Sequence, residues 1–182
     1  MPWVILDRDG VINHDSDAFI RSPQEWVPIP GSIEAMARLT RAGWRVAIAT
    51  NQSGLARGLF NAETLAAIHD KLERTVAARG GRIDALAYCP HGPDDGCTCR
   101  KPAPGLYREL ADRLGEPLQG VPVIGDSARD LEAAAAVGAR PVLVRTGKGE
   151  GTLARAGLPP GTEVHADLAA AVAALLEEGE GA

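Results

Sequence analysis

The sequence predicts an α/β fold in which helices cover both faces of a central parallel β-sheet. Short apolar runs alternate along the chain with longer amphipathic segments, which is the pattern of successive β-α-β units. The apolar runs are rich in Val, Ile, Leu and Ala throughout their length, as expected of strands covered on both faces. Glycines follow several amphipathic segments, where a left-handed residue commonly ends a helix.

The expected strands are the short apolar runs, at residues 3–6, 45–49, 85–89, 121–124 and 140–144. The expected helices are the amphipathic segments, at residues 32–42, 62–78, 104–114, 128–137, 152–156 and 167–177. Ser32 is predicted as the N-cap of its helix, with Glu34 well placed in the first turn. The glycines predicted to end helices are Gly43, Gly80, Gly115 and Gly138.

Length and composition exclude several classes of protein. The 182 residues suit one ordinary domain, so we expect residues 1–182 to form a single domain. A net charge of −5 with scattered acidic residues, and only 4% aromatic residues, argue against a nucleic-acid partner. No apolar run approaches the roughly 20 residues that span a bilayer, and no signal peptide is recognisable. We therefore expect a cytoplasmic protein without a membrane partner.

Three segments interrupt the alternation of strands and helices. Residues 14–30 form an irregular excursion, residues 90–104 are rich in Pro, Gly, Asp and Cys, and residues 146–160 are rich in glycine. Loops at the carboxyl ends of parallel strands are where such folds place their ligands. These segments are therefore candidate walls of a functional site.

Two carboxylates, Asp7 and Asp9, stand where the first apolar run stops. Because residues i and i+2 of a strand lie on the same side, both carboxylates can face one pocket. Two like charges this close favour a cation between them, and hard oxygen ligands suit Mg²⁺. Gly10, next in sequence, would let the backbone turn sharply. The alternative is a solvated acidic turn.

Polar residues also end the later strands. The second run ends in donors and small residues, Thr50 to Gly54, which can hold phosphate oxygens or form an ordinary polar turn. After the third run, Arg100 and Lys101 are either fixed cations for an anionic substrate or a solvated basic pair. After the fourth, Asp126 and Asp130 lie one helical turn apart, as two site carboxylates or as a helix cap. Four such strand ends together favour a site.

These residues resemble the signature of the haloacid dehalogenase superfamily, whose four elements occur in order across most of the chain. The resemblance implies a Rossmann-like three-layer sandwich and an aspartyl-phosphate mechanism. Asp7 would be the nucleophile and Asp9 the general acid and base. Magnesium would be held by Asp7, the Asp9 backbone carbonyl and Asp126.

The remaining signature residues would support this chemistry. By the resemblance, Thr50 and Lys101 would hold the oxygens of the transferring phosphoryl group. Asp130 would orient Lys101 or a metal-bound water rather than ligate the metal itself.

A second metal site is predicted in the cysteine-rich loop. Cys89, His91, Cys97 and Cys99 place three thiols and an imidazole within eleven positions, which matches a closed structural zinc site. A zinc ion would order this loop without secondary structure or core packing. The alternative is three buried cysteines and an exposed histidine. The other histidines, His14, His69 and His165, are expected at the surface.

Within the superfamily, this zinc loop and the lack of an inserted cap domain resemble two subfamilies. One removes the 7-phosphate of a heptose 1,7-bisphosphate in lipopolysaccharide-core synthesis, and the other hydrolyses histidinol phosphate. The run from Thr50 to Gly58 and the segment from Asn13 to Phe19 favour the heptose subfamily. By this resemblance, the substrate-binding residues would be Asp15, Ser16, Asp17, Ala18, Thr50, Asn51, Gln52, Ser53, Arg100 and Lys101.

The expected partner is thus a phosphorylated sugar, bound by a monomer. A different class of protein stays open beside these enzymes, namely a phospho-accepting regulatory domain with an acidic pocket. The zinc loop and the second strand-end carboxylate, Asp9, have no reason to occur in such a domain. The sequence does not reveal which anomer of the sugar would be bound.

Overall fold

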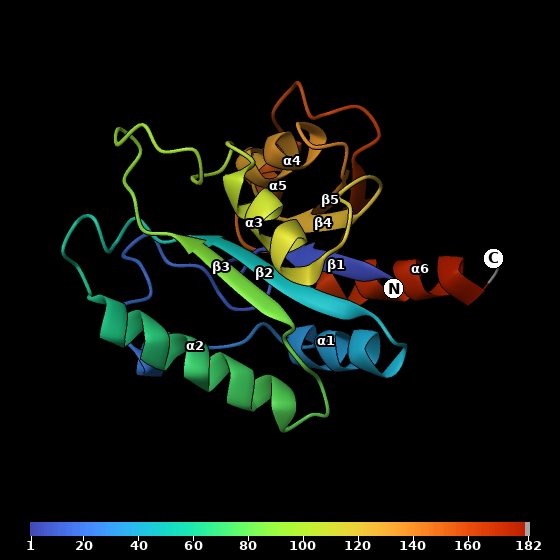
Figure 1. The fold of residues 1–182 in the computed structure, drawn as a ribbon, viewed down its shortest axis with the longest axis horizontal. Coiled ribbons are helices and arrows are strands. Elements are labelled where there is room, and N and C mark those ends of the chain that lie inside the picture. The colour runs from blue at the N-terminus through green and yellow to red at the C-terminus, as the bar shows by residue number, and fades with distance from the viewer. Residues whose placement is uncertain (181–182) are drawn as a thin grey trace.

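The computed structural model describes residues 1–180 and is built around one six-stranded parallel sheet (Figure 1). The strand order is β3-β2-β1-β4-β5-β6, so the chain winds outward in both directions from β1. The carboxyl ends of the central strands therefore meet at one edge of the sheet. The strands are β1 (Trp3–Leu6), β2 (Arg45–Asn51), β3 (Ala85–Cys89), β4 (Pro122–Gly125), β5 (Arg140–Val144) and β6 (Glu163–His165).

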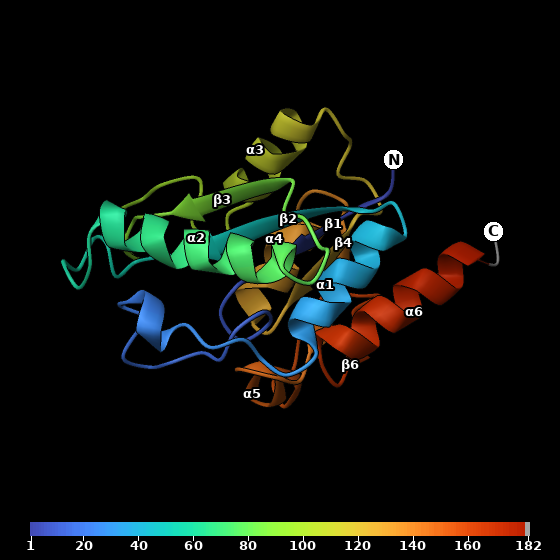
Figure 2. The ribbon, with the colours of Figure 1, turned by 90° about the horizontal axis from the view of Figure 1, so that it is seen from below.

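Helices cover the sheet on both faces. They are α1 (Ser32–Arg41), α2 (Ala62–Ala77), α3 (Gly105–Leu114), α4 (Ala128–Ala135), α5 (Gly149–Leu153) and α6 (Leu168–Glu180), with a short 3₁₀ helix at Pro23–Glu25. Figure 1 shows α1 and α2 on the side of the sheet opposite to α3 and α4. Figure 2 shows α1 beside α6. The predicted three-layer sandwich is confirmed.

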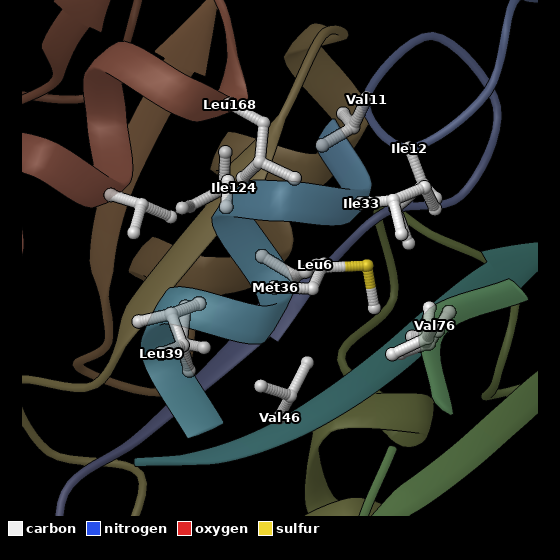
Figure 3. Close-up of a cluster of buried hydrophobic side chains, with 14 of the residues drawn as sticks. Leu6, Val11, Ile12, Ile33, Met36, Leu39, Val46, Val76, Ile124 and Leu168 are labelled. Carbon is white, nitrogen blue, oxygen red and sulfur yellow. The ribbon is translucent and has the colours of Figure 1, made fainter. Parts of the chain in front are cut away.

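The core divides into two apolar clusters, one on each face of the sheet. Alternate residues of β1 serve the two clusters, since Val4 and Leu6 point to one and Trp3 and Ile5 to the other. The first cluster adds Met36 of α1 and residues of α2 and α6 (Figure 3). All four β1 residues are buried, as the continuous apolar run predicts. A central strand held on both sides fixes the position of the residues that follow it.

Most element boundaries agree with the prediction, with two main differences. Strand β6 was not predicted, because Glu163–His165 offers one apolar residue between two polar ones. Helix α5 begins at Gly149 rather than at residue 152. The left-handed conformation predicted for the glycines after helices is confirmed, with φ between 65° and 81° at Gly43, Gly80, Gly115 and Gly138.

Two predictions about single residues are wrong. Ser32 does not cap α1, because Gly31 holds the cap position with φ 88° and the Ser32 hydroxyl donates to the Val11 carbonyl oxygen at 2.8 Å. His69 is not at the surface: the residue is 8% exposed, and its ring lies near Arg8 and Tyr88. His14 is exposed, as predicted, and His165 is partly buried.

The excursion after β1 is fastened to helix α2. Lys71 Nζ donates to the carbonyl oxygens of Pro23 at 2.7 Å and Trp26 at 3.0 Å, and lies over the Trp26 ring. Trp26 itself is 1% exposed. These contacts hold residues 14–30 over the carboxyl edge of the sheet, although most of the segment lacks regular structure. Among residues 1–180, no helix has the length and apolarity needed to cross a membrane.

Candidate active site

A cavity of about 670 Å³ opens at the carboxyl edge of the sheet. Its floor is formed by residues that follow β1, β2 and β4, and its walls come from the three irregular segments predicted as site walls. Most of the residues predicted for the site line this cavity, namely Asp7, Asp9, Asp15, Ser16, Asp17, Thr50, Asn51, Gln52, Ser53, Arg100, Lys101, Asp126 and Asp130. Ala18 is exposed and is not among the lining residues.

The carboxylate of Asp7 follows directly from strand β1. Its Oδ1 accepts hydrogen bonds from the Arg8 backbone N–H at 2.8 Å and from Lys101 Nζ at 3.0 Å. Within residues 1–180, no hydrogen bond reaches Oδ2. Burial raises the pKa of Asp7 well above its usual value, and the nearby Asp130 carboxylate adds to this. One oxygen is thus fixed, and the other is available to a ligand in the cavity.

Carboxylate oxygens of Asp7, Asp126 and Asp130 all lie within 4.8 Å of one another. Burial, followed by the proximity of Asp130, raises the pKa of Asp126 to about 7. A cluster of hard oxygens that repel one another in this way favours a divalent cation such as Mg²⁺. The Asp9 side chain is not part of the cluster. The donor set therefore fits the predicted magnesium ion, with any share from Asp9 left to its backbone.

Two glycines make room for the Asp126 carboxylate. Gly10 has φ 84°, and a Cβ built on it would lie 2.1 Å from Asp126 Oδ2. Gly147 has φ 57°, and its Cβ would lie 2.3 Å from the same oxygen. That oxygen also accepts a hydrogen bond from the Lys148 backbone N–H at 2.8 Å. Both glycines are needed for their conformation and for the close approach of the backbone.

Lys101 connects the carboxylates. Its Nζ lies 3.0 Å from Asp7 Oδ1 and 2.7 Å from Asp130 Oδ1, and it donates to the Ala49 carbonyl oxygen at 2.8 Å. Burial disfavours its charge, but Asp130 and Asp7 outweigh this and raise the Lys101 pKa well above its usual value. Asp130 Oδ2 accepts from the Ser127 backbone N–H and hydroxyl. Asp130 is therefore engaged on both oxygens, which suits the supporting role expected of it.

The second strand-end carboxylate, Asp9, has different partners. Its Oδ1 accepts from the Arg8 guanidinium and from Asn13 Nδ2, and its Oδ2 accepts from Gln52 Nε2 at 3.0 Å. Burial by itself raises the pKa of Asp9, but Arg8 and the hydrogen bonds outweigh burial and lower it. The two carboxylates, two residues apart, thus have opposite pKa shifts, which is common where two groups perform different chemistry.

The polar residues at the carboxyl end of β2 hold one another in place. The Thr50 hydroxyl accepts from Gln52 Nε2 at 2.9 Å. The Asn51 side chain is paired with the backbone of Lys101, since Oδ1 accepts from the Lys101 N–H and Nδ2 donates to its carbonyl oxygen, each at 3.1 Å. Asn51 therefore positions Lys101, a role that its place in the sequence did not reveal.

Cationic side chains that were not predicted also line the cavity. They are Arg57, Arg129, Lys148 and Arg155, beside the predicted Arg100. Burial and then the charge of Arg129 lower the pKa of Arg100, and Arg57 adds to the effect. Several guanidinium groups this close favour an anion between them. Arg57 lies in the loop after β2 and Arg129 in the first turn of α4, each soon after a strand end, so their position was the available signal.

Four ligand groups meet at the edge of the cavity, in the loop that follows β3. Cys89 Sγ, His91 Nδ1, Cys97 Sγ and Cys99 Sγ all lie within 4.8 Å of one another. Cys99 Sγ is 3.1 Å from Cys89 Sγ and 3.3 Å from His91 Nδ1. Three thiols and an imidazole are the donors of a structural zinc site and leave no open coordination position. The residues fit the predicted zinc ion.

Comparisons with known proteins agree with this fold and site. The family model described as HAD-hydrolase-like matches residues 98–171, and the model described as polynucleotide kinase 3 phosphatase matches residues 5–134. The chain therefore has the architecture of the haloacid dehalogenase superfamily of hydrolases, as its strand-end residues predict.

Relatives that match nearly the whole chain identify the family within this superfamily. The chain is 61% identical to the D-glycero-beta-D-manno-heptose-1,7-bisphosphate 7-phosphatase of Bordetella bronchiseptica, over 98% of this chain and 99% of the relative. It is 58% identical to the enzyme of that name from Pseudomonas putida, over 93% and 97%. The chain belongs to this family of phosphatases within the haloacid dehalogenase superfamily.

Two solved structures of heptose bisphosphate phosphatases have the same fold as this chain. The D,D-heptose 1,7-bisphosphate phosphatase from B. bronchiseptica, complexed with magnesium and phosphate, superposes with a TM-score of 0.96 over 98% of this chain and 99% of that chain, at 61% identity. The corresponding enzyme from Burkholderia thailandensis superposes with a TM-score of 0.78 over 97% and 99%, at 49% identity.

Proposed function

We propose that this protein is a magnesium-dependent phosphatase that removes the 7-phosphate from D-glycero-β-D-manno-heptose 1,7-bisphosphate, in the synthesis of the lipopolysaccharide core. The family membership and the names of the relatives support the substrate, including its β anomer. The observation that carries the chemistry is Asp7, whose Oδ1 is held by Lys101 while Oδ2 remains available in the cavity.

Asp7 Oδ2 attacks the phosphorus of the 7-phosphate, and the bond between phosphorus and the sugar oxygen breaks. Asp9 gives a proton to that departing oxygen, because an alkoxide is a poor leaving group. Asp9 then takes a proton from a water molecule that attacks the phosphorus of the aspartyl phosphate. This second step releases inorganic phosphate and restores the Asp7 carboxylate.

The transferring group needs compensation of its negative charge. Lys101, 3% exposed and fixed by three partners, lies beside Asp7 where the phosphoryl oxygens would pass. The Thr50 hydroxyl faces the same cavity. Magnesium, when bound by Asp7, Asp126 and the Asp9 backbone carbonyl, supplies further positive charge to the phosphoryl oxygens.

The phosphate that is not cleaved requires a second cationic region. Arg57 and Arg129 lie close enough to Arg100 to lower its pKa, and all three line the same cavity as Asp7. Their planar donors suit the oxygens of a phosphate group. The residues Asp15, Ser16 and Asp17, from the opposite wall, would face the sugar hydroxyls. A histidinol phosphate, with a single phosphate and a cationic amine, gives these guanidiniums no partner.

Several further features belong to this proposal. The zinc ion at Cys89, His91, Cys97 and Cys99 would order the loop that carries Arg100 and Lys101. Residues 1–182 would act as one domain, as a monomer in the cytoplasm, without a nucleic-acid partner. The net charge of −5 supports the last point, since a nucleic-acid enzyme normally has a basic surface.

Steady-state phosphate release with Mg²⁺ present tests the proposed function. The substrates are the β and α anomers of heptose 1,7-bisphosphate, histidinol phosphate and a 3′-phosphorylated oligonucleotide. We expect the highest kcat/KM for the β anomer. A higher kcat/KM for histidinol phosphate or for the oligonucleotide would show that heptose bisphosphate is not the preferred substrate. Asp9→Asn separates an enzyme, which loses turnover, from a phospho-accepting regulator, which would still take up phosphate.

A further inference from the structure

Arg8, between the two strand-end carboxylates, is a fully buried cation outside the proposed chemistry. Its exposed fraction is 0%. Side chains alternate along an extended segment, so Arg8 points away from the cavity that Asp7 and Asp9 line and toward helix α2. Its guanidinium donates to Asp9 Oδ1 through Nε at 3.0 Å and Nη2 at 2.8 Å. A buried charge of this kind must be paired, and Asp9 supplies the pair.

These contacts make the two oxygens of Asp9 unequal. Oδ1 accepts both hydrogen bonds from Arg8 and a third from Asn13 Nδ2 at 2.9 Å. Oδ2 accepts one hydrogen bond, from Gln52 Nε2, on the side of Thr50 and the cavity. Three donors leave Oδ1 no lone pair for a further proton. Oδ2 is therefore the oxygen that would exchange a proton with the substrate.

The remaining contact of the guanidinium is His69, on α2. His69 Nε2 lies 3.1 Å from Arg8 Nη1, and the histidine is 8% exposed. The centre of the Tyr88 ring lies 6.2 Å from that of the imidazole. An arginine can only donate, so Nε2 must accept and the imidazole must be neutral. Burial, followed by the charge of Arg8, lowers the His69 pKa to about 3, in agreement with this assignment.

We propose that His69 is a positioning residue for proton transfer: it fixes the Arg8 guanidinium, which occupies Asp9 Oδ1 and presents Asp9 Oδ2 to the leaving oxygen. The inference rests on the proposed phosphatase function. His69 lies behind the cavity and touches neither substrate nor metal ligands, so its effect must pass through Arg8 and Asp9. Substrate binding, which uses other walls of the cavity, should be unaffected.

The test uses first-turnover release of the leaving group, measured by rapid quench with Mg²⁺, from two esters. The heptose bisphosphate needs a proton on its leaving oxygen, whereas 4-nitrophenyl phosphate loses a stable anion. We expect His69→Leu to slow first-turnover release from the heptose bisphosphate about tenfold and from the aryl ester less than about twofold. KM should stay within about twofold of wild type, because uniform substrate binding is not altered.

Two further variants separate positioning from folding. His69→Gln keeps an acceptor for Arg8 and should restore most of the rate with the heptose bisphosphate. Ile68→Val changes the neighbouring residue on α2, whose buried side chain packs in the apolar cluster, and should keep wild-type rates with both esters. If His69→Leu is too unstable to measure, Arg8→Lys replaces it in the test. A lysine cannot hold Asp9 Oδ1 through two donors, so this variant should also slow first-turnover release from the heptose bisphosphate more than from the aryl ester.

Equal slowing of both esters, no slowing of either, or a His69→Gln variant as slow as His69→Leu would overturn the inference. A rise in KM at constant first-turnover rate would overturn it too. Wild-type protein that hydrolyses neither ester would instead reject the proposed function, and the inference with it.

Discussion

Lys101 is the residue on which the charges of the site converge. It is 3% exposed and lies between two carboxylates, Asp7 Oδ1 at 3.0 Å and Asp130 Oδ1 at 2.7 Å. The ammonium offsets the repulsion between these carboxylates, and in the proposed mechanism it also faces the path of the phosphoryl group. Its structural and chemical roles can be separated, because stability depends on the pair and activity depends on the charge in the cavity.

Replacing Lys101 by methionine leaves two buried carboxylates unpaired. We expect Lys101→Met to lower the free energy of unfolding by about 3 kcal/mol and kcat by about a thousandfold. The double variant Lys101→Met with Asp130→Asn removes one of the orphaned charges, so it should regain stability but no activity. Urea unfolding and steady-state kinetics measure both. Equal loss of stability in the single and double variants would refute the pairing.

Gly147 is a second residue whose identity the site requires. A Cβ at this position would lie 2.3 Å from Asp126 Oδ2 and 2.5 Å from Gly10 Cα, in a backbone with φ 57°. We expect Gly147→Ala to displace the carboxylate and to raise the Mg²⁺ concentration that gives half-maximal activity by about tenfold or more. Gly179→Ala, in open space on α6, is the control and should change nothing. An unchanged magnesium titration for Gly147→Ala would contradict this account of the site.

At the level of elements, the loop between β3 and α3 depends on its cysteines rather than on packing. Cys99 is followed directly by Arg100 and Lys101, and Arg100 Nη1 donates to the His91 carbonyl oxygen at 3.4 Å. An ion that joins both ends of the loop therefore also places two cations at the cavity. This explains how a segment with four prolines and two glycines, residues 90–104, can carry functional residues.

The zinc prediction has a direct measurement. Purified protein should contain about one zinc per chain by elemental analysis. Cys97→Ala should lose zinc, lower the melting temperature and raise KM for the bisphosphate more than it lowers kcat, because Arg100 would no longer be fixed. Wild-type protein with well under one zinc per chain would rule out this site, as would a Cys97→Ala variant with unchanged metal content.

The prediction from sequence succeeded where local signals and topology agree. Asp7, Thr50 and Asp126 each lie at the carboxyl end of an apolar strand. Parallel strands bring these ends to one edge of the sheet, so the meeting of the three residues could be predicted. Strand β6 could not be predicted in this way, because its pairing depends on the neighbouring strand β5 and not on its own three residues. The prediction that Ser32 caps α1 was wrong because the Ser32 hydroxyl donates to the carbonyl oxygen of Val11, a residue far away in sequence.

The Arg8–His69 contact marks a different limit. The spacing of Leu65, His69, Leu72 and Val76 puts His69 on the buried face of α2, and this signal was present in the sequence. A histidine on an apolar face does not identify its partner, however. The partner is fixed only when α2 packs against the end of β1, which requires the assembled fold.

At the scale of the whole molecule, one ion-pair network joins the far edge of the sheet to the C-terminal helix. Arg140 of β5 donates to Glu163 of β6 and, at 2.8 and 2.9 Å, to Glu178 of α6. The hydrogen bond from Arg140 lowers the pKa of Glu163 below its usual 4.5. The network adds stability above the pKa of the unfolded chain, and that stability is lost as the pH falls through the lower pKa of the folded protein.

Glu163→Gln tests this network. Because a third of the Glu163 side chain is exposed, solvent screens the pair, and we expect the melting temperature at pH 7 to fall by only about 2 °C. The difference from wild type should shrink as the pH drops below 4.5. Thermal unfolding at several pH values measures it, and a difference that grows toward low pH would contradict the assignment.

The central claim is that Asp7 becomes phosphorylated during turnover. The most direct measurement is acid quenching during turnover of the heptose bisphosphate with Mg²⁺, reduction with borohydride, and peptide mass spectrometry, since borohydride converts an aspartyl phosphate into homoserine. We predict homoserine at position 7. With 4-nitrophenyl phosphate, whose leaving group needs no proton, we predict more of it in the Asp9→Asn variant, where hydrolysis of the intermediate is slowed. Homoserine at another aspartate, or none in either protein while phosphate is still released, would contradict the account.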